Sequence, residues 1–384
     1  MIKRSAEEEL KALSIQFKAV ALTGPRQSGK TTLVKKTFPD KAYVSLENPD
    51  MRSYAINDPR GFLSNYPNGA ILDEVQRTPA LFSYLQQVLD ESNQNGLFIL
   101  TGSNNFLLQE SISQSLAGRI GYLTLLPLSL KEIGGLEGNI NQLIFKGGYP
   151  VLYASNTDPA KWFRNYIATY IERDVRQLKN IVDLTIFERF IRLCAGRTGQ
   201  LLNMNSLSLE TGVDQKTVAS WLSVLETSFI LFRLQPYYKS YNKRIIKMPK
   251  LYFYDTGLAA ALLGFDEAGM LEMHPFKGSL FENLVVTEFL KQRFNKGLSN
   301  NVYFWRDSTG NEIDLIIDKG QSLLPIEIKS GMTVTTDYFK GLNFWNKLTG
   351  SQDGIVIYAG DSQQTRSNGI KVIPLKDMDS IVPY

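Results

Sequence analysis

The chain has 384 residues, of which 43% are hydrophobic and 21% are charged, with a net charge of +4. This length predicts two or three domains, and the composition excludes a largely disordered protein. The net charge is too small to indicate nucleic-acid binding by itself. No segment is apolar over the length that crosses a bilayer, so we expect a cytoplasmic protein with no membrane partner. One cysteine and one histidine exclude an internal disulfide and the usual structural zinc sites.

The first predicted region, residues 1–130, alternates short β-type runs with helical segments. This alternation predicts a parallel sheet covered by helices, and therefore an α/β fold. The segment after the first run, Thr32–Phe38, is expected to form a helix. The predicted strands are Lys18–Thr23, Ala42–Leu46, Ala70–Leu72, Leu97–Thr101 and Tyr122–Leu126.

A segment with the pattern G-x-x-x-x-G-K-T directly follows the first predicted strand. In this pattern backbone N–H groups surround phosphates, the lysine Lys30 reaches the β and γ phosphates, and the hydroxyl of Thr31 binds magnesium. The sequence therefore predicts ATP and Mg²⁺ as cofactors. The predicted nucleotide-binding residues of this segment are Gly24, Pro25, Arg26, Gln27, Ser28, Gly29, Lys30, Thr31 and Thr32.

Two acids follow the predicted strand Ala70–Leu72. Asp73 is expected to hold Mg²⁺, and Glu74 to polarise the attacking water as the general base. A solvated turn is the alternative for both acids. Their position downstream of a phosphate-binding segment favours an ATP-hydrolysing site.

Three further polar residues are predicted to act near the γ phosphate. Ser103 and Asn104 follow the strand that ends at Thr101, which would place them at the sheet edge, although a simple turn is the alternative. Arg119 precedes the fifth strand and is predicted to stabilise the transferring phosphoryl group of a neighbouring subunit. An ordinary surface arginine is the alternative.

The order of these motifs resembles the AAA+ superfamily, in particular a bacterial and archaeal group of ATPases. The shared motifs are G-P-R-Q-x-G-K-T, L-D-E-x-Q-R-x-P at Asp73, T-G-S at Gly102, and L-A-G-R followed by L-x-P-L-S. The resemblance continues through G-G-Y-P at Gly147 and Y-I-E-R-D-V at Tyr170. It implies an ATPase lobe, a helical middle with a winged-helix-like part, and a C-terminal domain related to restriction endonucleases. We expect a homo-oligomer, for which a ring is one arrangement.

The second predicted region, residues 131–265, is mainly helical, with Trp162–Lys179 and Thr185–Cys194 as long amphipathic segments. The segments 205–211 and 215–225 are predicted to form two helices joined by a tight turn, with Asp214 as the N-cap of the second. Its core-facing residues are Val218, Trp221, Leu222 and Leu225. Lys216 would then face outward, where a winged helix contacts the major groove.

A basic, tyrosine-bearing stretch without acidic residues runs from Arg233 to Lys250. It lies where the wing of a winged helix is expected, with charges suited to phosphate contact. A solvated face, or a winged helix used as protein scaffolding, is the alternative. The predicted DNA-binding residues are Lys216, Lys239, Lys243, Arg244 and Lys247.

The third predicted region, residues 266–384, has mixed character. A helix is expected at Leu280–Phe294. The predicted strands are Val302–Arg306, Glu312–Ile317, Leu323–Lys329 and Gly354–Tyr358.

Two of these strands carry Asp314, Glu327 and Lys329 in the spacing D-x(12)-E-x-K. Side chains alternate along a strand, so Glu327 and Lys329 share a face, and a hairpin would bring Asp314 beside them. This resembles the PD-(D/E)xK nuclease family, which implies Glu282 as a further acid near the metal. The predicted metal ligands here are Glu282, Asp314 and Glu327, with Lys329 as a catalytic residue that positions water. A surface ion pair on a non-cleaving binding platform is the alternative.

Two functions remain open from the sequence. The first is an ATP-driven machine that acts on DNA and whose C-terminal domain binds or cuts it. Branched or single-strand-containing DNA is the candidate substrate. The second is a nucleotide switch for protein partners, with a catalytically silent nuclease-like domain.

Overall fold

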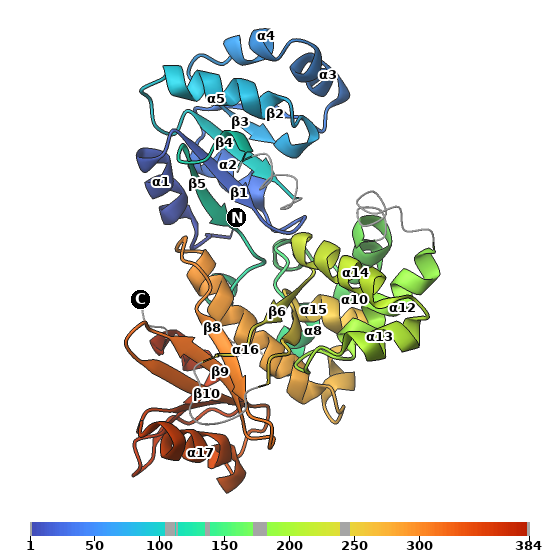
Figure 1. The fold of residues 1–384 in the computed structure, drawn as a ribbon, viewed down its shortest axis with the longest axis vertical. Helices are drawn as coiled ribbons and strands as arrows, with labels where there is room; N and C mark the ends of the chain where they lie inside the picture. The colour runs from blue at the N-terminus through green and yellow to red at the C-terminus, as the bar shows by residue number, and fades with distance from the viewer. Residues whose placement is uncertain are drawn as a thin grey trace. The chain divides into compact units, whose positions relative to one another are not determined.

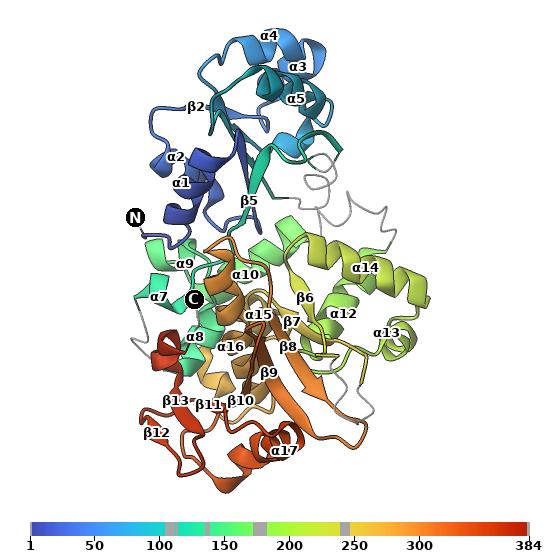
Figure 2. The ribbon, with the colours of Figure 1, turned by 60° about the vertical axis from the view of Figure 1, so that its left-hand side comes forward.

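The computed structural model describes residues 2–103, 112, 114–134, 139–171, 183–238 and 246–381. The chain divides into two compact units (Figures 1 and 2). The first unit contains Met1–Leu128, Thr227–Phe229 and Lys291–Ser299. The second contains Ser129–Glu226, Ile230–Leu290 and Asn300–Tyr384, so it includes both the helical middle and the C-terminal region. None of the described helices has both the length and the apolar character needed to cross a membrane.

A five-stranded sheet forms the centre of the first unit (Figure 1). Its order is β2-β3-β4-β1-β5, and every neighbouring pair is parallel, which confirms the predicted parallel sheet. The fifth strand lies slightly earlier in the sequence than Tyr122–Leu126. The strands are β1 (Ala19–Thr23), β2 (Ala42–Ser45), β3 (Ala70–Asp73), β4 (Phe98–Gly102) and β5 (Ile120–Thr124).

Helices cover both faces of this sheet because side chains alternate along its buried strands. In β1, Ala19 and Ala21 pack in the apolar cluster formed with α3, α4 and α5. Val20 and Leu22 pack in the opposite cluster with α1 and α2. The described helices of this unit are α1 (Glu7–Gln16), α2 (Lys30–Thr37), α3 (Pro49–Asn57), α4 (Pro59–Ser64), the 3₁₀ turn η1 (Val75–Arg77) and α5 (Leu81–Glu91).

The described part of the middle of the chain consists mainly of helices, together with a two-stranded hairpin. The predicted helix Trp162–Lys179 is only partly described: an α-helix ends at Tyr166, a π-type turn follows to Ile171, and the rest lies outside the described residues. The helices are α7 (Leu130–Ile133), α8 (Ile140–Lys146), α9 (Val151–Ala154), α10 (Pro159–Tyr166), η2 (Ile167–Ile171), α12 (Leu184–Ala195), α13 (Met204–Thr211), α14 (Gln215–Thr227), α15 (Thr256–Leu262) and η3 (Ala268–Leu271). The hairpin pairs β6 (Leu231–Leu234) with β7 (Lys250–Phe253) in antiparallel orientation.

A six-stranded mixed sheet forms the C-terminal part of the second unit, in the order β12-β13-β11-β10-β9-β8 (Figure 2). Its antiparallel pairs are β8 with β9, β9 with β10 and β12 with β13, and the remaining pairs are parallel. Trp345 of α17 packs against Trp305 of β8 and covers one face of the sheet. The elements are α16 (Lys277–Phe294), β8 (Val302–Arg306), β9 (Glu312–Asp318), β10 (Leu323–Lys329), η4 (Thr336–Phe339), α17 (Lys340–Thr349), β11 (Ile355–Tyr358), β12 (Gln364–Thr365), β13 (Lys371–Pro374) and η5 (Leu375–Ser380).

Candidate functional site

The Gly-rich loop between β1 and α2 curls tightly because two of its glycines have positive φ angles. Gly24 has φ +144°, and a Cβ there would lie 2.1 Å from the carbonyl oxygen of Leu125. Gly29 has φ +93° and is the N-cap of α2. Only glycine adopts such conformations without steric cost, so the loop can lead directly into the N-terminus of α2.

Lys30 begins α2 and its side chain is buried within the loop. Its Nζ donates to the carbonyl oxygens of Gly24 at 2.9 Å and Pro25 at 2.8 Å. Burial lowers the pKa of Lys30 to about 8, although Glu74 and Asp73 act in the opposite direction. The ammonium is thus held among neutral acceptors, where phosphate oxygens would be stronger partners.

Asp73 ends β3 and accepts hydrogen bonds from three hydroxyl groups. Thr31 donates to Oδ2 at 3.0 Å, and Tyr43 of β2 donates to the same oxygen at 2.6 Å. Thr101 of β4 donates to Oδ1. The structure therefore places the predicted pair Thr31 and Asp73 together. It adds Thr101 of the T-G-S motif, to which no role had been assigned, and Tyr43, which lies outside every motif.

Glu74 lies at the strand end with a backbone conformation that is rare for a residue with a side chain, at φ +55°. Its Oε2 accepts hydrogen bonds from Ser103 Oγ at 2.9 Å and Gln76 Nε2 at 2.5 Å. Strained conformations of this kind persist where the surrounding structure holds them, often at functional sites. Ser103 thus lies beside Glu74, while Asn104 lies outside the described residues.

An arginine to which the sequence analysis gave no role makes hydrogen bonds to the phosphate-binding loop. Arg4 is only 6% exposed. Its guanidinium donates to the carbonyl oxygens of Ser28 at 2.6 Å and Leu126 at 2.7 Å. The only signal in the sequence was a basic pair at the N-terminus, which is typical of an exposed segment. Arg4 therefore fixes the phosphate-binding loop to the segment that follows β5.

Arginines of two motifs share one acid at the rim of the loop. Arg77 Nη2 lies 3.2 Å from Glu47 Oε1, and Arg26 Nη1 lies 3.9 Å from the same oxygen.

Arg119 pairs with a different acid: its guanidinium contacts both carboxylate oxygens of Asp90, with Nε–Oδ1 at 2.5 Å and Nη2–Oδ2 at 2.9 Å. Its predicted role toward a neighbouring subunit stays a prediction.

The residues present at this loop fit a magnesium–nucleotide. Gly24 lets the loop pass close to the backbone of Leu125, and the hydroxyl of Ser28 is buried without a hydrogen-bond partner among the described residues. The hydroxyl of Thr31 and the carboxylate of Asp73 are oxygen donors of the type that Mg²⁺ prefers. Thr32 is exposed on the first turn of α2.

The two helices predicted at 205–211 and 215–225 correspond to α13 and α14. The side chain of Asp214 caps α14 by accepting from the N–H groups of Lys216 at 2.8 Å and Thr217 at 3.0 Å, as predicted. The predicted core residues are buried, whereas Lys216 is exposed. These core residues are Val218, Trp221, Leu222 and Leu225.

The basic stretch after α14 is not uniformly solvated. Arg233 is paired with Glu226, with Nη2–Oε2 at 2.6 Å, and Lys250 is buried at the start of β7. These two residues therefore do not contribute to an exposed basic face, because acids outside the stretch bind them. Lys247 is exposed. Lys239, Lys243 and Arg244 lie outside the described residues.

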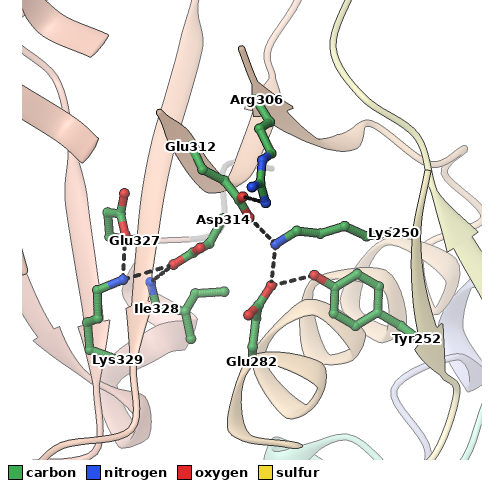
Figure 3. Close-up of polar contacts among 9 residues, drawn as sticks. All are labelled: Lys250, Tyr252, Glu282, Arg306, Glu312, Asp314, Glu327, Ile328 and Lys329. Atoms are coloured by element: carbon green, nitrogen blue, oxygen red, sulfur yellow. Dashed lines mark hydrogen bonds and ion pairs between the residues drawn. The ribbon is translucent and has the colours of Figure 1, made fainter. Parts of the chain in front are cut away.

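The β9–β10 hairpin gathers the predicted D-x(12)-E-x-K residues (Figure 3). Lys329 Nζ lies 2.6 Å from Glu327 Oε2 and 3.3 Å from Asp314 Oδ2. The N–H of Ile328 donates to Asp314 Oδ2 at 2.8 Å. Burial and the charge of Asp314 raise the pKa of Glu327 to about 9. Burial acts to raise the pKa of Asp314 too, but Lys329 and Lys250 lower it below its ordinary value.

The fourth predicted residue, Glu282 of α16, has a different partner. Its Oε1 accepts from Lys250 Nζ at 2.9 Å and from the hydroxyl of Tyr252 at 2.5 Å (Figure 3). Lys250 also forms an ion pair with Glu312, which Arg306 contacts at 2.8 Å. Over the ranges that the structure describes, no three acidic, histidine or cysteine side chains are grouped so that they could hold a metal ion.

As arranged, these C-terminal residues do not fit a resident metal ion. One oxygen of each of these carboxylates faces a lysine ammonium, and a cation at those oxygens would be repelled by it. The metal-ligand prediction for Glu282, Asp314 and Glu327 is not supported by this geometry, because Lys250, which lies outside the motif, enters the cluster.

The strand order, the loop and the acids at the end of β3 together define a P-loop ATPase domain. The family described as "AAA domain" matches residues 16–134, in agreement with this class. Two families described as domains of unknown function, DUF8612 and DUF4143, match residues 137–269 and 277–378.

The chain belongs to the same family as uncharacterized protein Rv2008c of Mycobacterium tuberculosis. The two are 32% identical over 336 residues, which cover 86% of this chain and 74% of the relative. Uncharacterized protein Mb2031c of Mycobacterium bovis matches to the same extent. Among solved structures, the Walker-type ATPase PABY2304 of Pyrococcus abyssi covers 67% of this chain and 94% of its own, at 13% identity and a TM-score of 0.39.

Proposed function

We propose that the protein is an ATP-hydrolysing machine that acts on DNA, with hydrolysis in the AAA domain and DNA contact in the helix-turn-helix region. The observation that carries the ATPase part is the Asp73–Glu74 pair at the sheet edge. Asp73 accepts hydrogen bonds from the hydroxyl groups of Thr31, Tyr43 and Thr101, and Glu74 accepts one from Ser103. The DNA-acting part is supported by the exposed face of α14.

Residues of the loop would bind the nucleotide first. Lys30 would exchange the carbonyl oxygens of Gly24 and Pro25 for phosphate oxygens, and the N–H groups at the start of α2 would favour the same anion. Thr31 and Asp73 would hold Mg²⁺. The chemistry that bound Mg²⁺ supplies is neutralisation of charge on the β and γ phosphates.

Glu74 is the group that would accept the proton of the attacking water. Its Oε2 is held by Ser103 and Gln76, which leaves the carboxylate oriented at the edge where β3 and β4 end. A carboxylate fixed in this way needs no reorganisation when water is deprotonated. The AAA+ arrangement further suggests that Arg119 completes the site of a neighbouring subunit in a homo-oligomer, after release from Asp90.

DNA binding is proposed for the second unit. The capped start of α14 exposes Gln215 and Lys216, and its opposite face is anchored by Trp221. A helix anchored on one face and polar on the other can enter a major groove. Lys247, together with Lys239, Lys243 and Arg244, would contact phosphates.

A second function is favoured by the C-terminal cluster. Because Lys250 and Lys329 neutralise its carboxylates internally, no cleavage step follows from the geometry. A nucleotide switch for protein partners, with the C-terminal domain as a silent platform, would use the same ATP site without DNA.

One experiment separates the two functions. Steady-state ATP hydrolysis by the full chain is measured alone and with single-stranded, duplex and four-way DNA, with Glu74→Gln as the control for contaminating ATPase. Stimulation by any DNA supports the proposed function. Turnover that exceeds the Glu74→Gln background but is unaffected by every DNA would favour the switch.

A further inference from the structure

Lys250 is a lysine buried in the second unit. It begins β7 opposite Leu234 of β6 and is only 2% exposed. Lysine is among the residues that are almost never fully buried unless they are paired. A buried ammonium at this position therefore indicates strong partners.

Those partners come from two elements that are distant in the sequence. The ammonium lies 2.9 Å from Glu282 Oε1 of α16 and forms a second ion pair with Glu312 of β9. Its electrostatic interaction extends to Asp314. Figure 3 shows the Nζ atom between the carboxylates of Glu282 and Glu312, with Asp314 next to them.

The neighbouring groups reinforce this arrangement. Tyr252, two positions along β7, has its hydroxyl on the same Glu282 oxygen that faces Lys250. Arg306 holds the other oxygen of Glu312 at 2.8 Å. These contacts give each carboxylate two donors, which offsets the cost of burying its charge.

The charges of the cluster nearly balance without an added ion. Its carboxyl groups are Glu282, Glu312, Asp314 and Glu327, the last with a pKa raised to about 9, and its cations are Lys250, Arg306 and Lys329. A divalent ion at the same oxygens would lie against two ammonium groups. Like charges in contact repel one another, so a divalent ion is disfavoured there.

We propose that Lys250 is an internal cation that takes the place of a divalent metal ion between Glu282, Glu312 and Asp314. The nuclease-like carboxylates then serve to bind the β6–β7 hairpin to the C-terminal sheet. This inference is independent of the proposed action on DNA, since it concerns only how the cluster is neutralised.

The experiment measures Mn²⁺ binding to the full-length chain without nucleotide, by electron paramagnetic resonance. The wild-type protein should have no Mn²⁺ site that depends on Asp314. Lys250→Met removes the charge and keeps an unbranched apolar side chain, so it should gain one Mn²⁺ site per chain. Adding Asp314→Asn to this variant should remove the gained site. Lys250→Arg, the matched control, keeps the charge and should gain none.

Melting temperatures give a second measure of the same binding. Mn²⁺ should raise the melting temperature of Lys250→Met by several degrees and leave that of the wild type unchanged, because a ligand stabilises only the state it binds. A wild-type Mn²⁺ site that Asp314→Asn abolishes would overturn the proposal, and this measurement does not depend on whether the Lys250 variant folds. A folded Lys250→Met that gains no site would overturn it too.

Discussion

Asp73 is oriented by the fold before any nucleotide binds. Three hydroxyl groups donate to its carboxylate, and the phenol of Tyr43 is the donor that lies outside every recognised motif. Burial and the hydrogen bond to Asp73 raise the pKa of Tyr43 above its ordinary value, so this phenol stays a donor at neutral pH. A carboxylate fixed in this way avoids the entropy cost of ordering at each catalytic cycle.

At the residue scale, Glu74→Gln should separate nucleotide binding from hydrolysis. The amide keeps the size of the side chain but cannot accept the proton of water, so turnover should fall by about 10²–10⁴-fold. Affinity for ATP should stay within a few-fold, whereas Lys30→Ala should lose tight binding. Single-turnover hydrolysis and equilibrium binding of labelled ATP test both statements. Hydrolysis at the wild-type rate in Glu74→Gln would show that another group is the base.

Nucleotide affinity should also depend on pH through Lys30. Its pKa of about 8 without nucleotide means that the ammonium form, which binds phosphate, is lost as the pH rises above that value. Affinity for a non-hydrolysable ATP analogue should therefore fall between about pH 7.5 and about pH 9.5, where phosphate, with a second pKa of about 6, is already ionised. An affinity that is constant over this window would show that Lys30 stays charged in the free protein.

At the scale of elements, the positions of several strands could be predicted from the sequence because these strands are strongly apolar. β1, β3, β8 and β10 occur where runs of apolar residues were found, and the β9–β10 hairpin brings Asp314 and Lys329 together as the spacing predicts. The two-residue strand β12 was missed since two residues carry no periodicity. Partners from outside a motif could not be found: the sequence contains no local signal that joins Lys250 to Glu282, or Arg4 to Ser28.

The basic stretch that follows α14 gives a test at the same scale. Replacing Lys239, Lys243, Arg244 and Lys247 with alanine should weaken binding to every DNA sequence similarly, since phosphate contacts do not read bases. The slope of log affinity against log salt should become shallower by about 0.9 for each phosphate that is no longer neutralised. Fluorescence anisotropy at several salt concentrations measures this slope. Lys340→Ala and Lys371→Ala, which alter exposed lysines of the C-terminal domain, are the matched controls. An unchanged slope would place the DNA-binding surface elsewhere.

At the scale of the whole molecule, three family matches correspond to two compact units. The AAA domain matches most of the first unit, whereas DUF8612 and DUF4143 both match residues of the second. Two contacts join the regions matched by DUF8612 and DUF4143. Lys250 of the β6–β7 hairpin pairs with Glu282, and Tyr237 N donates to Phe304 O of β8 at 2.7 Å. The predicted three-part division at residues 130 and 265 remains a prediction about sequence regions.

Arg119 tests whether the ATPase works as an assembly. If this arginine acts on the nucleotide of a neighbouring subunit, mixing Arg119→Ala chains with wild type should reduce turnover more than dilution does. The mutant chains would disable wild-type sites next to them. Turnover is measured across mixing ratios at a fixed total concentration, with Asp90→Ala chains as the control for loss of the ion pair. A strictly proportional decline would argue that Arg119 acts within its own chain or has no catalytic role.

The ion pairs of Lys250 also imply that the two domains of the second unit should occur together in one protein. The lysine lies in the segment matched by DUF8612, and both carboxylates that bind it lie in the segment matched by DUF4143. Separating a buried pair leaves an unpaired charge that costs about 3–5 kcal/mol. A protein that contained only one of these two segments would thus be destabilised, unless the charged residues left without a partner were replaced as well. Among relatives, loss of the lysine should therefore accompany replacement of Glu282 or Glu312, or the return of a metal ion.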